Sequence, residues 1–387
     1  MFKPAANLQH PFLLTNTYCH FQCYLRIMQT QFSYAELSSF ASKVFVSIGF
    51  SQADAETATA ALLSADLRGV DSHGIARLSG YVRLWEVGRL NAKPNVAVTY
   101  QTPSTAVVDG DLGVGLVVAP FAMQVAIEKA KLAGTGWVSV QNSNHFGIAG
   151  YHAMMALPHD MIGIAMTNAS PLVAPTFSTE RLLGTNPIAV AIPAGNFPPF
   201  VADFATTTAA NGKLELLQRE QKAVPEGWVQ DEAGAASTDA HALKQGGALL
   251  PLGGDRAHGS HKGYMLGSIV DIFSAILSGA NYGPWVPPFP AYVPMPTNMP
   301  GKGIGHFFGA MRIDAFRPAA EFKLNMDNWI ERFKAAKVVD GAPAVIIPGE
   351  PEAAMEAVRR KEGISIADTV LQDIKELASK FNVHLGN

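Results

Sequence analysis

Strand-like and helix-like segments alternate along the middle of this sequence, and no other feature constrains the fold as much. The predicted strands cover residues 98–101, 106–109, 137–141, 162–167, 188–192, 200–204 and 307–313. Helices are expected between several of them, including 121–132 with Pro120 at its first position. Such alternation predicts a layered α/β architecture. The chain has 387 residues, which favours two or three lobes over a single core.

Helical periodicity dominates both ends of the chain. We expect it from Met28 onward, and the Ser-x-x-Asp signal of Ser51 and Asp54 begins a helix that ends at Arg68, before Gly69. Further helices are predicted over about 74–87, 261–278, 319–336, 351–360 and 366–381. Residues 110–115 are expected to form a loop, and the polar residues 225–254 a surface excursion. Residues 284–300 contain seven prolines, which predicts an extended arm of a kind that often covers a neighbouring subunit.

Composition narrows the function classes. The net charge of −3 leaves no cationic surplus for a nucleic-acid backbone or an anionic membrane surface, so we expect neither partner. Cys19 and Cys23 lie in the first 25 residues, so the core has no disulfide framework, and a reducing cytoplasm is the expected location. Residues 1–28 lack an unbroken apolar signal stretch and are interpreted as an extension. The apolar residues 264–280 include Asp271 and are shorter than the roughly 20 residues of a membrane span, so we interpret them as a buried helix.

The glycine fingerprint of an ordinary dinucleotide site, Gly-x-Gly-x-x-Gly between a strand and a helix, is absent from the sequence. The glycine cluster of 301–305 follows a loop rich in Met and Pro and precedes a strand, which favours the start of a hairpin. The loop 110–115 carries its glycines in the reverse order of this fingerprint, as Gly-x-x-Gly-x-Gly. If a dinucleotide binds this chain, an ordinary Rossmann turn does not hold it.

Two histidines stand out by their position. His73 and His145 each follow short polar residues and precede a glycine that opens a helix, where an imidazole can serve as a proton donor near neutral pH. Arg77 lies one helical turn beyond His73 and could hold a carboxylate, although such an arginine often faces solvent. Lys262 begins an apolar helix, against the helix dipole, which fits either a phosphate or ribose contact or a surface lysine.

Metal and nucleophile chemistry have weaker support. His258 and His261 are close in sequence, but no carboxylate pair nearby completes a ligand set, so no metal is expected. Ser72 is adjacent to His73, yet the sequence has no Gly-x-Ser-x-Gly motif, which disfavours a hydrolase.

In order along the chain, eight short strings make the sequence resemble the second, non-Rossmann type of the malate/L-lactate dehydrogenase family, which includes ureidoglycolate, sulfolactate and diketogulonate oxidoreductases and a cyclic-imine reductase. They are RGVDSHGIARL at 68–78, SNHFG at 143–147, GTNP at 184–187, Asp203 with ATT at 205–207, GK at 212–213, PEGW at 225–228, HKGY at 261–264 and PGE at 348–350. They extend from about residue 34 to the end of the chain. Each string alone is weak, but eight in the expected order are specific.

The resemblance implies roles for individual residues. His145 is similar to the family's acid/base residue, and His73 to a histidine that some members use as proton donor; we favour His145 and keep His73 beside it. Ser72 and Arg77 resemble substrate-holding residues. The residues similar to contacts of the nicotinamide cofactor, NAD or NADP, are Ala169, Asp203, Phe204, Ala205, His261, Lys262, Pro348, Gly349 and Glu350. No metal is implied.

The resemblance also implies an overall organisation. The expected fold is a non-Rossmann α/β sandwich with a mixed sheet, of the sulfolactate dehydrogenase-like type, with a helical N-terminal lobe, paired as an intertwined homodimer. The expected lobes are an extension at 1–28, a helical lobe of 29–95 joined by helices of 350–387, a central substrate and dimer lobe of 96–135 and 301–349, and an NAD(P)-binding lobe of 136–300. Residues 254–260 and the proline-rich 284–300 are longer than the resemblance implies, and 1–27 match nothing in the family.

We therefore expect an NAD(P)-dependent oxidoreductase that interconverts a small 2-hydroxy acid, such as malate, lactate or ureidoglycolate, and its 2-keto acid by direct hydride transfer. A cyclic-imine (ketimine) carboxylate reductase is the alternative within enzymes, because it would use the same hydride geometry. A catalytically silent dimeric binding protein and a metal-dependent hydrolase are the alternatives from other classes.

Overall fold

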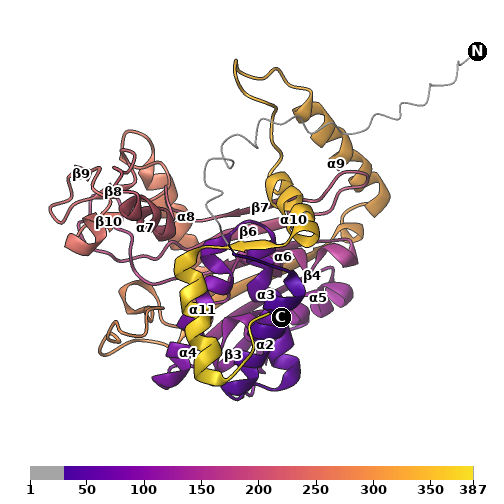
Figure 1. Ribbon diagram of the computed structural model, residues 1–387. Helices are drawn as coiled ribbons and strands as arrows, with labels where there is room; N and C mark the ends of the chain where they lie inside the picture. The colour runs from indigo at the N-terminus through magenta and orange to yellow at the C-terminus, as the bar shows by residue number, and fades with distance from the viewer. Residues whose placement is uncertain (1–29, 387) are drawn as a thin grey trace, which may run out of the picture.

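One seven-stranded mixed sheet forms the centre of the computed structural model, which describes residues 30–386 (Figure 1). Its strands have the spatial order β2-β3-β4-β11-β5-β6-β7. Only β3 and β4 are parallel, and every other neighbouring pair is antiparallel. The bounds are β2 Ala97–Gln101, β3 Thr105–Gly113, β4 Thr135–Ser143, β5 Met161–Thr167, β6 Ile188–Ile192, β7 Phe200–Phe204 and β11 Ile304–Arg312.

Helices cover both faces of this sheet, because successive side chains of a strand point in opposite directions. Phe308 of β11 belongs to the apolar core shared with helices α5 (Gly115–Ala133) and α6 (Ala149–Met154). The next residue back, Phe307, instead contacts Phe273, at a ring distance of 5.2 Å. Phe273 lies in the π-helical turn Ile272–Ile276 that continues helix α8 (Ser260–Asp271). The fold is therefore the expected α/β sandwich with a mixed sheet.

A second core joins the two ends of the chain. It combines buried side chains of α2 (Tyr34–Ser47), α3 (Gln52–Leu67) and α4 (Leu78–Glu86) with others from α11 (Asp368–Phe381). A short antiparallel pair, β1 (Thr30–Phe32) and β12 (Ile364–Ile366), ties these ends together. Ser51 caps α3 by accepting a hydrogen bond from the backbone N–H of Asp54 at 3.1 Å, which confirms the predicted helix start.

The remaining elements lie outside these two cores. Helices α9 (Ala319–Lys334) and α10 (Glu350–Glu362) follow the central sheet in sequence, and both were predicted within a few residues of these bounds. A three-stranded sheet of β8 (Val229–Gln230), β9 (Ala236–Ser237) and β10 (Ala248–Leu249) lies beside α7 (Asn211–Arg219), to the left in Figure 1. No helix of residues 30–386 is long and apolar enough to cross a membrane.

The prediction for residues 225–254 was wrong in one respect. The segment is polar and rich in turns, but it forms the small sheet with a core of its own, which includes fully buried Val229 and Leu249. Val173 and Leu183, from a distant part of the chain, complete this core. A two-residue strand leaves almost no periodic signal, so long-range packing decided this structure.

The predicted loop at 110–115 was also wrong. Strand β3 continues to Gly113 and α5 begins at Gly115, so Pro120 lies inside the helix instead of at its first position. A proline there removes one backbone hydrogen bond. Burial of Leu116, Val117 and Val118 offsets that loss, because it requires the extra helical turn.

Other corrections concern helix ends. Residues 30–32 form β1 instead of the expected helix, and Ile366 belongs to β12 instead of the last helix, since the two segments pair with each other. The predicted helix 261–278 changes from α-helix to a π-helical turn after Asp271. The interpretation of this segment as a buried helix was wrong for one face, where large apolar side chains such as Met265 and Ile272 are exposed because no other element of residues 30–386 covers them. The expectations for Cys19, Cys23 and Met28 lie outside the described residues. The division into lobes stays a prediction, and one continuous sheet runs through both the expected central lobe and the expected NAD(P) lobe.

Candidate active site

Strand direction brings distant segments of the predicted site to one edge of the sheet. Strands β4, β5 and β7 run the same way, because each is separated from the next by a single antiparallel strand. His145 follows the end of β4, and Ala169 follows the end of β5. Asp203 and Phe204 end β7, and Ala205 follows it. Ligands of open α/β sheets bind at the carboxyl ends of strands. The topology therefore gathers these residues where a ligand is expected.

The segment after α3 is a tightly shaped junction, as predicted. The buried carboxylate of Asp66 accepts a hydrogen bond from the backbone N–H of Ile75 at 2.7 Å. A Cβ atom at Gly74 would overlap that carboxylate, so only glycine fits there. Arg359 of α10 donates to the backbone carbonyl of Asp66 and forms an ion pair with Asp71. Burial raises the pKa of Asp66 to about 8, so its carboxyl is largely protonated at neutral pH.

Two 3₁₀ turns after this junction carry the predicted substrate-side residues. Ser72 Oγ lies 2.9 Å from Nδ1 of His73 in the turn Asp71–His73. Arg77 ends the next turn, Ile75–Arg77, and its Nε donates to the carbonyl of Ser72 at 2.6 Å. The ring of His73 stacks on that of His145, with centroids 5.7 Å apart. The structure thus brings together Ser72, His73, Arg77 and His145, although 68 positions separate Arg77 from His145 in the sequence.

A tyrosine fixes the orientation of His145. The buried hydroxyl of Tyr81 lies 2.7 Å from Nδ1 of His145, and the backbone N–H of Gly147 donates to the same nitrogen at 3.3 Å. A backbone N–H can only donate, so Nδ1 is an acceptor and neutral His145 carries its proton on Nε2. The hydrogen bonds thus assign the tautomer with Nε2–H.

Both imidazoles are neutral at pH 7. Burial, together with the nearby guanidinium of Arg77, lowers the pKa of His73 to about 4. Burial, followed by the repulsion of His73 and Arg77, lowers the pKa of His145 well below 6.5. Neutral imidazole can accept or donate a proton, so the pair suits acid/base chemistry.

Sequence reasoning missed two residues of this cluster. Tyr81 lies four residues after Arg77, so helical spacing could have placed it beside the predicted site. Phe289 lies in the proline-rich segment, and its ring centroid is 4.8 Å from that of His145. The guanidinium carbon of Arg77 lies 5.7 Å from the same ring. No local pattern marks Phe289, because only the course of the chain brings it here.

A buried asparagine connects Ala169 to helix α8. Asn186 accepts a hydrogen bond from the backbone N–H of Ala169 at 3.1 Å and donates to the carbonyl of Gly267 at 2.9 Å. It is fully buried and has a φ of 36°, in the left-handed region. These two hydrogen bonds fix the position of Ala169 relative to helix α8, which carries His261 and Lys262. Asn186 lies within the GTNP string, but no role was predicted for it.

The other residues predicted to contact the cofactor differ in exposure and in the hydrogen bonds that their side chains make within the protein. The Asp203 carboxylate accepts the backbone N–H of Gly150 at 2.7 Å. Part of the residue is open to solvent, but packing around the carboxyl desolvates it and raises its pKa to about 6. Phe204 is 40% exposed, Ala205 is half-buried and Lys262 is exposed. His261 Nδ1 lies 2.9 Å from a guanidinium nitrogen of Arg256.

The turn of Pro348, Gly349 and Glu350 lies alongside β7. The Pro348 carbonyl accepts the backbone N–H of Val201 at 3.0 Å, and Gly349 has a φ of 94°. Glu350 forms an ion pair with Lys334 at 2.6 Å. Its other oxygen accepts the backbone N–H of Ile347 at 3.0 Å, so both carboxylate oxygens stabilise the turn itself.

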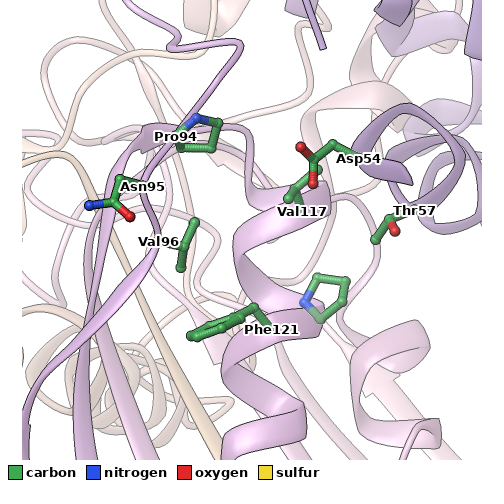
Figure 2. Close-up of a pocket in the computed structure, with 8 residues that line it drawn as sticks. Asp54, Thr57, Pro94, Asn95, Val96, Val117 and Phe121 are labelled. Atoms are coloured by element: carbon green, nitrogen blue, oxygen red, sulfur yellow. The ribbon is translucent and has the colours of Figure 1, made fainter. Parts of the chain in front are cut away.

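A surface pocket lies outside the predicted site. Figure 2 shows a pocket of about 420 Å³ between the first turns of α3, the chain before β2 and helix α5. Its one acidic side chain, Asp54, interacts with Ser51 at the start of α3. None of the residues predicted for catalysis or cofactor binding lines this pocket. Within residues 30–386, no group of three His, Cys, Asp or Glu side chains could hold a metal ion.

Comparison with known proteins identifies the family of this chain. The family model described as malate/L-lactate dehydrogenase matches residues 32–375. A malate dehydrogenase of Pyrococcus abyssi is 42% identical over 349 residues, which cover 90% of this chain and 94% of that protein. An L-sulfolactate dehydrogenase of Methanocaldococcus jannaschii is 37% identical over 343 residues, covering 88% and 94%.

The fold gives the same result. A crystal structure of malate dehydrogenase from Entamoeba histolytica superposes with a TM-score of 0.86 and 34% identity, covering 93% of this chain and 100% of that chain. The sulfolactate dehydrogenase of M. jannaschii superposes with a TM-score of 0.83, covering 92% and 98%. This chain therefore belongs to the malate/L-lactate dehydrogenase family of oxidoreductases, with the sulfolactate dehydrogenase-like fold.

Proposed function

We propose that this protein is an NAD(P)-dependent dehydrogenase that interconverts a small 2-hydroxy acid and its 2-keto acid. The observation that carries the proposal is the placement of Arg77 and His145 against the same aromatic ring, that of Phe289. A guanidinium that holds the carboxylate and an imidazole that faces the hydroxyl are the two groups this reaction needs around C2.

Arg77 is suited to hold the substrate carboxylate. Its Nε donates to Ser72, which fixes the plane of the guanidinium. Among residues 30–386 no acceptor lies within hydrogen-bond distance of its two terminal nitrogens, so both are available for a bidentate carboxylate contact. Holding the reacting carbon in this way can remove about 7 to 11 kcal/mol of the barrier.

His145 is suited to move the hydroxyl proton. In reduction Nε2 of the doubly protonated ring donates its proton to the carbonyl oxygen of the keto acid, which leaves a neutral ring with its proton on Nδ1. In oxidation Nε2 of that neutral ring takes the proton back from the hydroxyl. The reacting ring therefore carries a proton on Nδ1 that the resting tautomer lacks. The Tyr81 hydroxyl both donates and accepts, so by rotation it can stabilise Nδ1 with or without a proton. The stacked ring of His73 lies next to His145 and is the second candidate for proton donor.

The cofactor-side residues fit a dinucleotide bound without a glycine fingerprint. A bound nicotinamide supplies the hydride acceptor in oxidation and the hydride donor in reduction. Ala169 has no side chain beyond Cβ, and Asn186 holds its backbone at the sheet edge while also bonding Gly267 of α8. Phe204 and Lys262 are both exposed, and an apolar ring face and a cation are groups that bind nucleotides.

The test is a panel of substrates. Malate, lactate, ureidoglycolate, sulfolactate and a cyclic-imine carboxylate are each offered with NAD and NADP in the appropriate redox state, and nicotinamide absorbance is followed. We expect turnover of at least one 2-hydroxy acid and no loss of activity with a chelator. Turnover of the cyclic imine alone would replace the proposed substrate class. If neither nucleotide bound in a fluorescence titration, the chain would be a silent binding protein.

We also infer a homodimer. The outer face of α8 and its π-helical turn exposes a row of large apolar side chains, Tyr264, Met265, Ile269, Ile272, Phe273, Ile276 and Leu277. Contiguous apolar patches of this kind mark association surfaces. Light scattering should give the mass of two chains, and Ile272→Asp should shift that mass toward one chain. A monomer at micromolar concentration in the unmodified protein would contradict this inference.

A further inference from the structure

The proline-rich arm of residues 284–300 begins at a fixed point. The backbone N–H of Gly283 donates to the buried carboxylate of Asp271 at 2.9 Å. The other oxygen of that carboxylate accepts a hydrogen bond from the side chain of Asn168 at 2.9 Å. Asn168 directly precedes Ala169, so the start of the arm is attached to the end of β5.

Two further contacts fix the arm around Phe289. The backbone N–H of Phe289 donates to Ser170 Oγ at 3.0 Å. Arg89, which follows α4, donates to the carbonyl of Pro288. Prolines stand on both sides of Phe289, at 288 and 290, and proline restricts φ to near −65°. Contacts from Ser170, after β5, and from Arg89, after α4, therefore fix the backbone that carries the Phe289 ring.

The ring itself lies in a site shaped to receive it. It meets Tyr81 edge-on at 5.5 Å and packs against the core of the helical region. A Cβ atom at Gly80 would lie 2.7 Å from the tip of the ring, so helix α4 has room for the ring only because residue 80 is glycine. The ring is half-buried, which leaves one surface facing the space beside His145 and Arg77.

The chemistry of a 2-hydroxy acid assigns a role to that surface. In the proposed function, the carboxylate of C2 binds Arg77 and the hydroxyl binds His145. Phe289 contacts both of these side chains, so a substituent on the same carbon meets its ring next. A fixed apolar ring favours substituents that fit the remaining space. It offers no hydrogen bond to a polar substituent.

We propose that Phe289 is a specificity-determining residue whose ring limits the length of the side chain that a 2-hydroxy acid can carry on C2. This inference rests on the proposed function. It gives the proline-rich arm a role in substrate selection. The arm delivers one aromatic wall to a site whose other members come from the helical region and from the end of β4.

The experiment compares Phe289→Ala and Phe289→Leu with the unmodified protein on lactate, 2-hydroxybutanoate, 2-hydroxyhexanoate and 2-hydroxyoctanoate. We expect kcat/KM for the octanoate relative to lactate to rise about tenfold or more in Phe289→Ala and by a smaller factor in Phe289→Leu. The change should fall mainly on KM, while the Kd for the nucleotide stays within about twofold. Phe289→Tyr preserves the ring size and should keep the original ranking.

Tyr292→Ala is the matched control, because Tyr292 lies on the same arm and is 86% exposed. It should leave the ranking of the four acids unchanged. An unchanged ranking in both Phe289→Ala and Phe289→Leu, with normal unfolding midpoints, would overturn this inference and leave the proposed function intact. If the unmodified protein oxidised no 2-hydroxy acid with either nucleotide, the proposed function would fail and this inference with it.

Discussion

The two sides of the candidate site are built differently. On the substrate side, His73, His145, Tyr81 and Phe289 contact one another through their side chains, and each ring limits the movement of the next. On the cofactor side, Ala169 is held through its backbone, and Lys262 and Phe204 are exposed. The groups proposed for proton transfer are therefore arranged before any ligand binds, whereas the residues proposed to contact the cofactor stay open to solvent. This difference predicts losses of turnover on one side and losses of binding on the other.

Replacement of His145 should give the largest effect. His145→Ala removes the group proposed to carry the proton, and general acid/base catalysis contributes about 10² to 10⁴ in rate. We expect kcat to fall by that factor while the Kd for the nucleotide changes by less than about twofold. Steady-state kinetics and a nucleotide titration measure the two quantities. His241→Ala, at an exposed histidine, is the control, and an equal kcat in His145→Ala and this control would remove His145 from the mechanism.

Arg77 should rank second. Arg77→Ala loses charge-assisted hydrogen bonds worth about 1.5 to 3 kcal/mol, which corresponds to roughly a 10- to 150-fold loss of kcat/KM. Most of the loss should appear in KM for the acid. Arg77→Lys should recover only part of it, because an ammonium cannot form the bidentate contact. A normal KM in Arg77→Ala would place the substrate carboxylate elsewhere.

Asp66 offers a test of the junction that does not depend on activity. Its folded-state pKa, about 8, lies above the ordinary 3.8, so the folded state holds the proton more tightly. The stability contributed by this proton is complete below about pH 4 and is lost as pH rises through 8. Relative to Asp66→Asn, the free energy of unfolding should decline between these limits by up to about 1.4 kcal/mol per pH unit.

Urea denaturation at several pH values measures this difference. The asparagine keeps an acceptor for the N–H of Ile75, so the junction should still form in the variant. Asp340→Asn, at an exposed aspartate, should follow the unmodified protein at every pH. Curves for Asp66→Asn that ran parallel to those of the unmodified protein would show that the Asp66 carboxyl is not protonated in the fold.

Lys262 should give the smallest effect. The lysine is exposed, and surface electrostatic contacts contribute about 1 kcal/mol or less. Lys262→Ala should therefore weaken nucleotide binding by up to about fivefold and leave kcat at saturating nucleotide unchanged. Lys244→Ala, at an exposed lysine of the small-sheet region, is the control. A fall in kcat in Lys262→Ala would contradict the division between a chemical side and a binding side.

Local sequence patterns predicted the elements that depend on residues close together in the sequence. The cap at Ser51 depends on a few neighbouring residues, and the strands at 188–192 and 200–204 pair with each other across a short connection. The tight junction before Arg77 was recognised from its own glycines and polar residues, although Arg359 also holds it. Strand β1 was missed because its partner, β12, lies more than 300 residues away. The small sheet was missed for the same reason, since Val173 and Leu183 complete its core.

For the site, residue types in the sequence were sufficient to nominate His73, His145 and Arg77, because imidazole and guanidinium have chemistry that their neighbours can reveal. The sequence alone could not show that Phe289 and Asn186 belong to the same site, because a phenyl ring and an amide acquire a role only from what they touch. Strand direction and the course of the proline-rich arm settled those contacts. Both depend on pairing between residues far apart in the chain, which tertiary structure alone decides.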